Sequence, residues 1–308
     1  MKQCCTARRP DKPDKEKESI MRLSTSTCIY FNRPGGVKAS ILDSVRRCGD
    51  AGYKVLDMNF HDLSVFNTPF RTDDWQRLIE DAKEVADSYG IEFSQGHSHF
   101  YNFCDPNAPE KEFKDELIRR AIEGARILGI KWLVIHAATD FDSPTLVKDS
   151  KRKTIEYLKP RIELAGKYGV GIALENLWEE NIAPKRRYCT TAEELVDLVD
   201  SLPYSNVGCC WDVEHAAICH QDQRKALAYI GKRLKATHIS DYNTVQNDHI
   251  LPYMGLVDWQ EVMDALRIAD YQGDFTYEIH NYTANMPEAG IMTALRHSIA
   301  IGNHLLTL

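Results

Sequence analysis

The chain has 308 residues, of which 43% are hydrophobic and 27% are charged. This composition is typical of a globular domain, and a chain of this length can bury a large core without disulfides. The 38 basic and 45 acidic residues leave a net charge of −7, whereas nucleic-acid binding needs a basic face. The longest nearly apolar run, 132–138, is far shorter than the ~20 residues that span a bilayer. We therefore expect neither nucleic acid nor membrane as a partner.

Neither the cysteines nor the first residues indicate a secreted protein. The nine cysteines are odd in number and form no CxxC pair, which is typical of a reduced, cytoplasmic protein. Residues 1–20 carry several lysines and arginines, two prolines and no apolar stretch, so they form no secretory signal. We expect a disordered extension over residues 1–20, with Met21 a candidate start of translation, and a catalytic domain over residues 21–308.

From Arg22 onward the chain repeats one unit, in which a short apolar run is followed by a loop and a stretch of helical periodicity. The segments 73–89 and 113–128 each place apolar residues on one helix face, and Thr191 and Glu194 form a capping box. Eight strand-like runs predict an α/β protein, a single-domain (β/α)8 TIM barrel. The runs, four of which open on a glycine suited to a helix C-cap, are 23–31, 52–57, 90–94, 129–136, 169–175, 207–211, 234–239 and 275–279.

Polar side chains gather where these strands end, which is the face that carries the active site of such barrels. Four strands in succession end at Glu175, Asp212, His238 and Glu278, and three carboxylates with one imidazole suit Mn2+, Mg2+ or Co2+. The sequence thus favours a metal site over separate strand caps. The whole set of rim residues is Asp57, Asn59, His61, His97, His99, His136, Glu175, Asn176, Asp212, His215, His238, Asp241, Glu278 and His280.

Five motifs in this order resemble the signature positions of the xylose isomerase-like barrels. They are 174–176, 211–215, 238–241, 249–259 and 277–279, and the resemblance covers about residues 22–305. It implies that Glu175, Asp212, His238 and Glu278 hold one divalent cation, for which we expect Mn2+. It also implies that Glu175 and Glu278 act as an acid and base pair, in a sugar isomerase or epimerase that abstracts a proton next to a carbonyl through an enediolate.

The expected partner is a small-molecule sugar or sugar derivative. We expect its hydroxyl groups to be bound by rim side chains that both donate and accept hydrogen bonds, together with one aromatic ring. For His97 and His136, additional metal binding is the alternative, and for His215 it is support of the metal ligands. The expected substrate-binding residues are His215, His97, His136, His249, Asp241 and Phe100.

Two departures from the family pattern keep other reactions open. Ketose 3-epimerases usually carry an arginine soon after the histidine of strand seven, where this chain has 242–244, Tyr-Asn-Thr; and Glu214 stands where many relatives have glycine. The alternative is a lyase, either a keto-cyclitol dehydratase or the catalytic subunit of a C-glycoside deglycosidase, which would work with a small second subunit. A homo-oligomer is also open.

Two further alternatives have less support from the sequence. An endonuclease IV-like enzyme would use His97, His136 and His249, but Asn247 stands where its motif has aspartate. A non-catalytic sugar-binding subunit would have no need of two opposed carboxylates around a cation.

Overall fold

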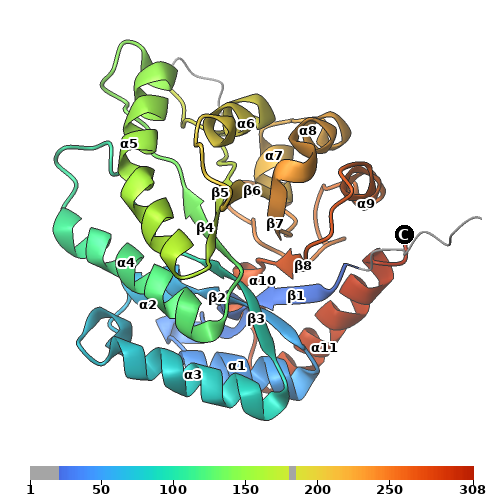
Figure 1. Cartoon of the computed structure of the whole chain (residues 1–308). Coiled ribbons are helices and arrows are strands. Elements are labelled where there is room, and N and C mark those ends of the chain that lie inside the picture. Colours follow the sequence, from blue (N-terminus) through green and yellow to red (C-terminus); the bar gives the residue numbers. More distant parts are fainter. Residues whose placement is uncertain (1–20, 180–184) are drawn as a thin grey trace, which may run out of the picture.

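The computed structural model describes residues 21–179 and 185–308. The extension expected over residues 1–20 therefore lies outside the described residues. Within the described part, eight parallel strands follow one another around a barrel (Figure 1). They are β1 (Leu23–Ser26), β2 (Val55–Asn59), β3 (Glu92–His97), β4 (Trp132–His136), β5 (Gly171–Glu175), β6 (Val207–Asp212), β7 (Leu234–His238) and β8 (Phe275–Tyr277).

The strands pair in the order β7-β6-β5-β4-β3-β2-β1-β8. Strands that follow one another in the sequence therefore pair, except β7 and β8, which stand at the two ends of this order. Ile239 closes the ring between β7 and β8. Its N–H donates to the carbonyl of Thr276 at 2.8 Å, and its own carbonyl accepts from the N–H of Glu278 at 3.0 Å. The predicted (β/α)8 TIM barrel is thereby confirmed.

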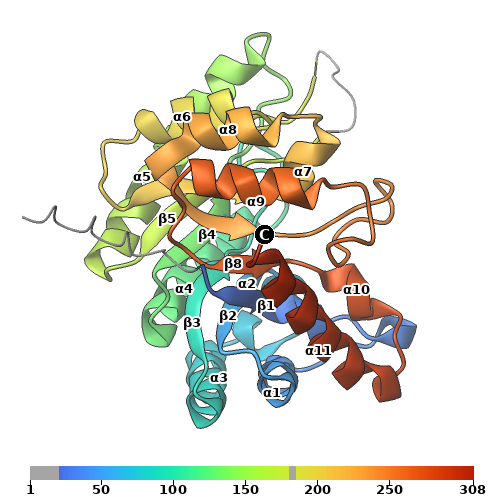
Figure 2. The ribbon, with the colours of Figure 1, turned by 90° about the vertical axis from the view of Figure 1, so that its right-hand side faces the viewer.

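Helices surround the barrel and cover the outer faces of the strands (Figures 1 and 2). Short 3-10 turns, such as Thr27–Tyr30, add to them. The helices are α1 (Ile41–Ala51), α2 (Phe60–Val65), α3 (Trp75–Tyr89), α4 (Lys111–Leu128), α5 (Leu146–Lys167), α6 (Ala192–Asp200), α7 (Val213–Ile218), α8 (Gln223–Ile230), α9 (Trp259–Ile268), α10 (His280–Ala284) and α11 (Glu288–Leu305). Among these described helices, none combines the length and the apolar character needed to cross a bilayer.

The ends of two strands differ most from those expected. The run 23–31 is a strand only as far as Ser26, because the Ser26 hydroxyl accepts the N–H of Cys28 at 3.5 Å and caps a 3-10 turn. The run 90–94 instead continues to His97, which pairs with Asn59 of β2 and Val134 of β4. The ladder between two neighbours thus extends β3 through residues that show no apolar pattern.

The core has an inner and an outer part. Inside the barrel, Val134, Ala173, Cys210 and Ala236 form one fully buried layer. Outside it, the other faces of the strands pack against the helices in a single large cluster. The functional side chains follow two residues after this inner layer, on the same inward-facing side of each strand. The layer therefore forms the floor on which they stand.

The last helix, α11, lies beside α1 and β1 (Figure 2). A methyl group at Gly302 would overlap the Leu23 side chain and lie 2.9 Å from the hydroxyl oxygen of Tyr277. At Gly290, on the same helix, the nearest atoms belong to the flexible Met286 side chain, at 3.1 and 3.2 Å.

We expect Gly302→Ala to lower the free energy of unfolding by about 1–3 kcal/mol, because it forces α11 away from β1. The matched change Gly290→Ala should be neutral or stabilising, by up to about 1 kcal/mol, because alanine favours the helix. Urea unfolding followed by circular dichroism measures both. Equal stability of the two variants would contradict this account of the α11 contact.

Candidate active site

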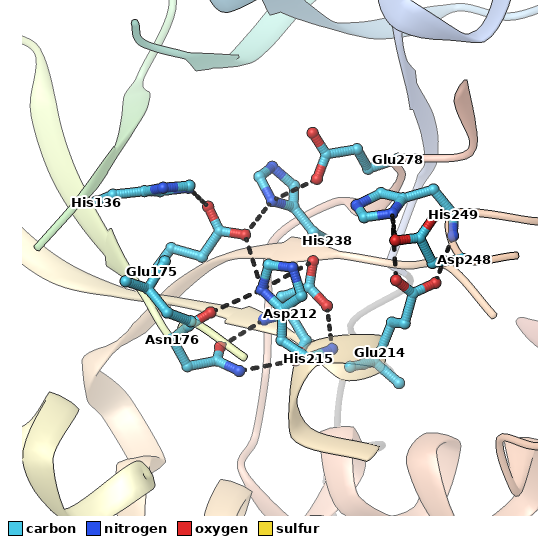
Figure 3. A network of polar contacts seen from close by, with 12 residues as sticks. His136, Glu175, Asn176, Asp212, Glu214, His215, His238, Asp248, His249 and Glu278 are labelled. Carbon is cyan, nitrogen blue, oxygen red and sulfur yellow. Dashed lines mark hydrogen bonds and ion pairs between the residues drawn. The ribbon is translucent and has the colours of Figure 1, made fainter. Parts of the chain in front are cut away.

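The carboxyl ends of β4 to β8 bring the predicted metal ligands together (Figure 3). In the strand ladders His136 pairs with Glu175, and Asp212 pairs with His238, so these four ends lie at matching levels. Glu278 directly follows β8, where the backbone contact with Ile239 holds it. Strand register therefore determines which side chains meet here.

Glu175, Asp212, His238 and Glu278 offer ligand atoms that all lie within 4.8 Å of one another. All four side chains are buried. Nδ1 of His238 lies 2.9 Å from Oε1 of Glu175 and 3.2 Å from Oε2 of Glu278, so the two glutamates flank one imidazole nitrogen. The structure thus brings together the whole set that the sequence singled out.

The charge balance of this cluster fits a divalent cation. Burial and the negative charge of Glu175 raise the pKa of Asp212 to about 8. One Asp212 oxygen accepts the backbone N–H of His215 at 2.7 Å, while Oδ2 is buried without a hydrogen-bond partner. Three buried carboxylates around one imidazole repel one another, and oxygen ligands of this kind are those that Mn2+ and Mg2+ prefer. The donor set therefore suits such an ion.

His136 and His97 surround the other oxygen of Glu175. Nε2 of His136 lies 2.8 Å from Oε2 of Glu175, and Nε2 of His97 lies 3.3 Å from the same oxygen. Burial opposes ionisation of Glu175, but the charges of His238 and His136 hold its pKa well below the usual range. Both oxygens of this one carboxylate are therefore engaged by imidazoles.

Two further histidines lie beside the cluster: His215, which belongs to α7, and His249, which belongs to the loop after β7. Nδ1 of His215 lies 2.8 Å from the backbone carbonyl of Asn176. The Asn176 side chain in turn donates to the carbonyl of Asp212 at 2.9 Å and accepts its N–H at 2.7 Å. Asn176 thus ties β5 to β6, a role that its place on the rim did not reveal.

A cavity of about 540 Å³ opens above the cluster. Polar and aromatic side chains both line it. Phe100 lies flat against His61, with ring centroids 4.0 Å apart, and against His136, at 4.4 Å. The predicted metal-binding and substrate-binding residues in the lining are His97, His136, Glu175, His215, His249, Glu278 and Phe100, and further aromatic lining residues are Phe66, Tyr101, Phe141 and Trp178.

The loops between strands and helices supply the lining residues that sequence reasoning missed. Lys38, Phe66, Phe141 and Trp178 lie on the cavity wall but stand in loops and turns without periodicity. A second hollow of about 590 Å³ lies at the opposite, amino-terminal ends of the strands, beside Arg22. It contains none of the predicted site residues.

Asp241 does not lie where a substrate-binding residue was expected. Its side chain is fully buried and outside the cavity lining. It accepts hydrogen bonds at 2.9–3.2 Å from the backbone N–H groups of residues 242, 253, 255 and 257 and from the indole N–H of Trp259. Because five donors already surround this carboxylate, Asp241 anchors the loop after β7 instead of binding a ligand.

We expect Asp241→Asn to lower the free energy of unfolding by at least about 2 kcal/mol, because the amide NH2 would face buried donors. Asp258→Asn is the matched control in the same loop, since Asp258 is exposed and its cap on the N–H of Glu261 suits asparagine equally. Thermal unfolding and hydrogen exchange over residues 242–257 measure the effect. Unchanged protection of this loop in Asp241→Asn would contradict the anchoring role.

Three relatives are similar in sequence to part or most of this chain. An uncharacterized protein of Methanocaldococcus jannaschii is 27% identical over 288 residues, which cover 89% of each chain. D-psicose 3-epimerase of Enterocloster bolteae is 27% identical over 207 residues, or 64% of each chain. Inosose isomerase of Bacillus velezensis is 25% identical over 171 residues, which cover 52% of this chain and 58% of the isomerase. The match thus spans less than two thirds of the length of either enzyme.

Solved structures share the fold over nearly the whole chain. A D-tagatose 3-epimerase-like protein superimposes with a TM-score of 0.73 at 20% identity, covering 93% of this chain and 97% of the other. The IolI protein with a bound zinc atom gives 0.70 at 18% identity, covering 93% and 98%. The family model described as xylose isomerase-like TIM barrel matches residues 45–301. The chain therefore belongs to the xylose isomerase-like TIM barrel family.

Proposed function

We propose that the chain is a sugar isomerase or epimerase that depends on a divalent cation and moves a proton next to a carbonyl group. The observation that carries this proposal is the buried cluster in which Glu175 and Glu278 flank the same nitrogen of His238. The similarity to D-psicose 3-epimerase and to inosose isomerase supports the same class of reaction.

Glu175, Asp212, His238 and Glu278 would hold the cation, for which we propose Mn2+, with Mg2+ or Co2+ as alternatives. When bound, it would polarise the substrate carbonyl and stabilise the negative charge that develops on its oxygen. The zinc atom bound to the structurally similar IolI protein supports a divalent ion in this fold.

The two glutamates would carry the protons. Burial opposes ionisation of Glu278, but the charges of His238 and His97 hold its pKa at about 2, and Glu175 is likewise ionised. A carboxylate in this state can accept a proton from carbon, although it is a weak base and requires an acidified C–H bond. One glutamate would remove the proton from carbon and become a carboxylic acid. The other, also ionised at rest, would return a proton only after taking one up from solvent or from a substrate hydroxyl. Epimerisation or isomerisation follows from the position to which the proton returns.

The remaining predicted residues would orient the sugar. Histidines around the cavity both donate and accept hydrogen bonds, which suits hydroxyl groups, and Phe100, whose ring stacks on His61 and His136, offers its exposed apolar edge. The proposed substrate-binding residues are His215, His97, His136, His249 and Phe100.

A lyase reaction is the second candidate, and the aromatic residues that line the cavity favour it. Phe66, Phe100, Phe141 and Trp178 line a space of about 540 Å³, which suits a substrate that carries an apolar group beside its sugar ring. The same carboxylates would remove the proton, and a β-substituent would then leave. Product mass separates the candidates, because an isomerase leaves the mass unchanged and a lyase lowers it.

Removal of the metal should abolish activity. We expect EDTA treatment followed by dialysis to stop turnover of D-psicose and related ketoses, and added Mn2+ or Co2+ to restore it, because the carboxylate-rich set leaves a buried charge imbalance without a cation. Turnover is followed by chromatography and product mass, and bound metal by elemental analysis. Full activity in protein shown to be free of metal would contradict the proposal.

Glu278→Gln should cost far more rate than metal affinity, since an amide oxygen still coordinates weakly but cannot accept a proton. We expect turnover at saturating Mn2+ to fall by about a hundredfold to ten-thousandfold, with exchange of substrate hydrogen into D2O falling in parallel. Asp212→Asn is the comparison, because it should lose metal first and recover partly when Mn2+ is raised. Hydrogen exchange at the unmutated rate in metal-loaded Glu278→Gln would exclude the paired-carboxylate mechanism.

A further inference from the structure

The loop between β7 and α9 brings one side chain, His249, into the cavity lining. Two buried carboxylates hold this loop. Asp241 accepts hydrogen bonds from donors within residues 242–259, and the carboxylate of Glu214, in α7, contacts His249. The arrangement is therefore a rigid support for one imidazole at the edge of the metal cluster.

Glu214 engages both the backbone and the ring of His249 (Figure 3). Its Oε2 accepts the backbone N–H of His249 at 2.7 Å, and its Oε1 lies 3.2 Å from the ring Nδ1. Asp248 approaches the same nitrogen, with Oδ2 at 3.6 Å, and is itself held by the side chain of Asn281 at 2.9 Å. Glu214 is fully buried and does not line the cavity, so its carboxylate serves His249 and not a ligand.

His249 also has a strained backbone. Its φ of 48° lies in the left-handed region, which residues other than glycine rarely adopt because their side chains make it unfavourable. The contact from Glu214 on its N–H, and that from the N–H of Asn281 on its carbonyl at 3.2 Å, keep the residue there. Strain of this kind persists where the surroundings over-determine the geometry, and it gathers at functional sites.

With Nδ1 turned to the carboxylates, the other ring nitrogen of His249 points toward the side of Glu278 and His238 (Figure 3). The ring of His280 packs against it at a centroid distance of 4.3 Å, which limits rotation. In the described structure Nδ1 makes no hydrogen bond, and its 3.2 Å separation from Oε1 of Glu214 is an ion-pair contact. A proton on Nδ1 would face this carboxylate and leave Nε2 for a substrate oxygen.

We propose that Glu214 is a positioning residue, which orients His249 so that Nε2 contacts a hydroxyl of the sugar. This inference rests on the proposed function for the identity of the ligand, but not for the orientation of the ring. It assigns Glu214 to substrate recognition through His249.

A double-mutant cycle tests the positioning role. Glu214→Gln keeps an oxygen for the backbone N–H but loses the carboxylate at Nδ1, so kcat/KM for D-psicose should fall about 10–100-fold. His249→Gln should cost at least as much, and the double variant should be no worse than His249→Gln alone, because Glu214 acts through that ring. Glu193→Gln is the matched control, because Glu193 is the exposed second residue of α6, and this variant should retain wild-type kcat/KM. Additive losses, or a Glu214→Gln enzyme with wild-type kcat/KM, would overturn the proposal.

The orientation of the ring is tested without turnover. In metal-free protein, 1H–15N correlation spectra of the histidine rings should show hydrogen on Nδ1 of His249, and this signal should change in Glu214→Gln but not in Glu193→Gln. An unchanged His249 signal in Glu214→Gln would refute the positioning role whether or not the protein turns over ketoses. A changed signal in a protein without ketose turnover would instead retain the positioning role and refute the proposed function.

Discussion

The burial of three carboxylates around one imidazole is the constraint on which the rest of this site depends. Burial by itself would lower the pKa of His238, but the charges of Glu278 and Glu175 raise it well above the ordinary range for an imidazole. The same burial raises the pKa of Asp212 to about 8. A cluster with this imbalance is costly to fold unless hydrogen bonds or a cation offset the repulsion. The histidines and backbone donors around it are therefore part of the electrostatics, not only of the shape.

The surrounding structure holds these side chains with other buried polar groups. Asn176 links the backbone of β5 and β6, and Asp241 and Glu214 secure the loop after β7. Each of these groups has at least one oxygen or nitrogen that already accepts or donates within the protein. Through these hydrogen bonds the three groups hold β6 and the loop after β7 in place beside the cluster, as polar groups around a functional site commonly do.

Two chemically different kinds of side chain line the cavity. The histidines and carboxylates come from the strand ends and the segments that follow them, and the aromatic side chains come from the loops after β2 to β5. Such loops can change without disturbing the barrel, whereas the strand ends are part of the fold itself.

The sequence by itself predicted the barrel, because short apolar runs alternate with stretches of helical periodicity. It also singled out the four side chains that meet in the buried cluster, because each carboxylate or imidazole directly ends an apolar run. Only the tertiary structure decided the rest. Asp241 and His249 belong to two neighbouring motifs, yet Asp241 is surrounded by five donors of its own loop and His249 reaches the cavity. Strand periodicity reports which way a residue in a strand points, whereas the direction of a loop side chain depends on hydrogen bonds to residues far away in sequence, as between Glu214 and His249.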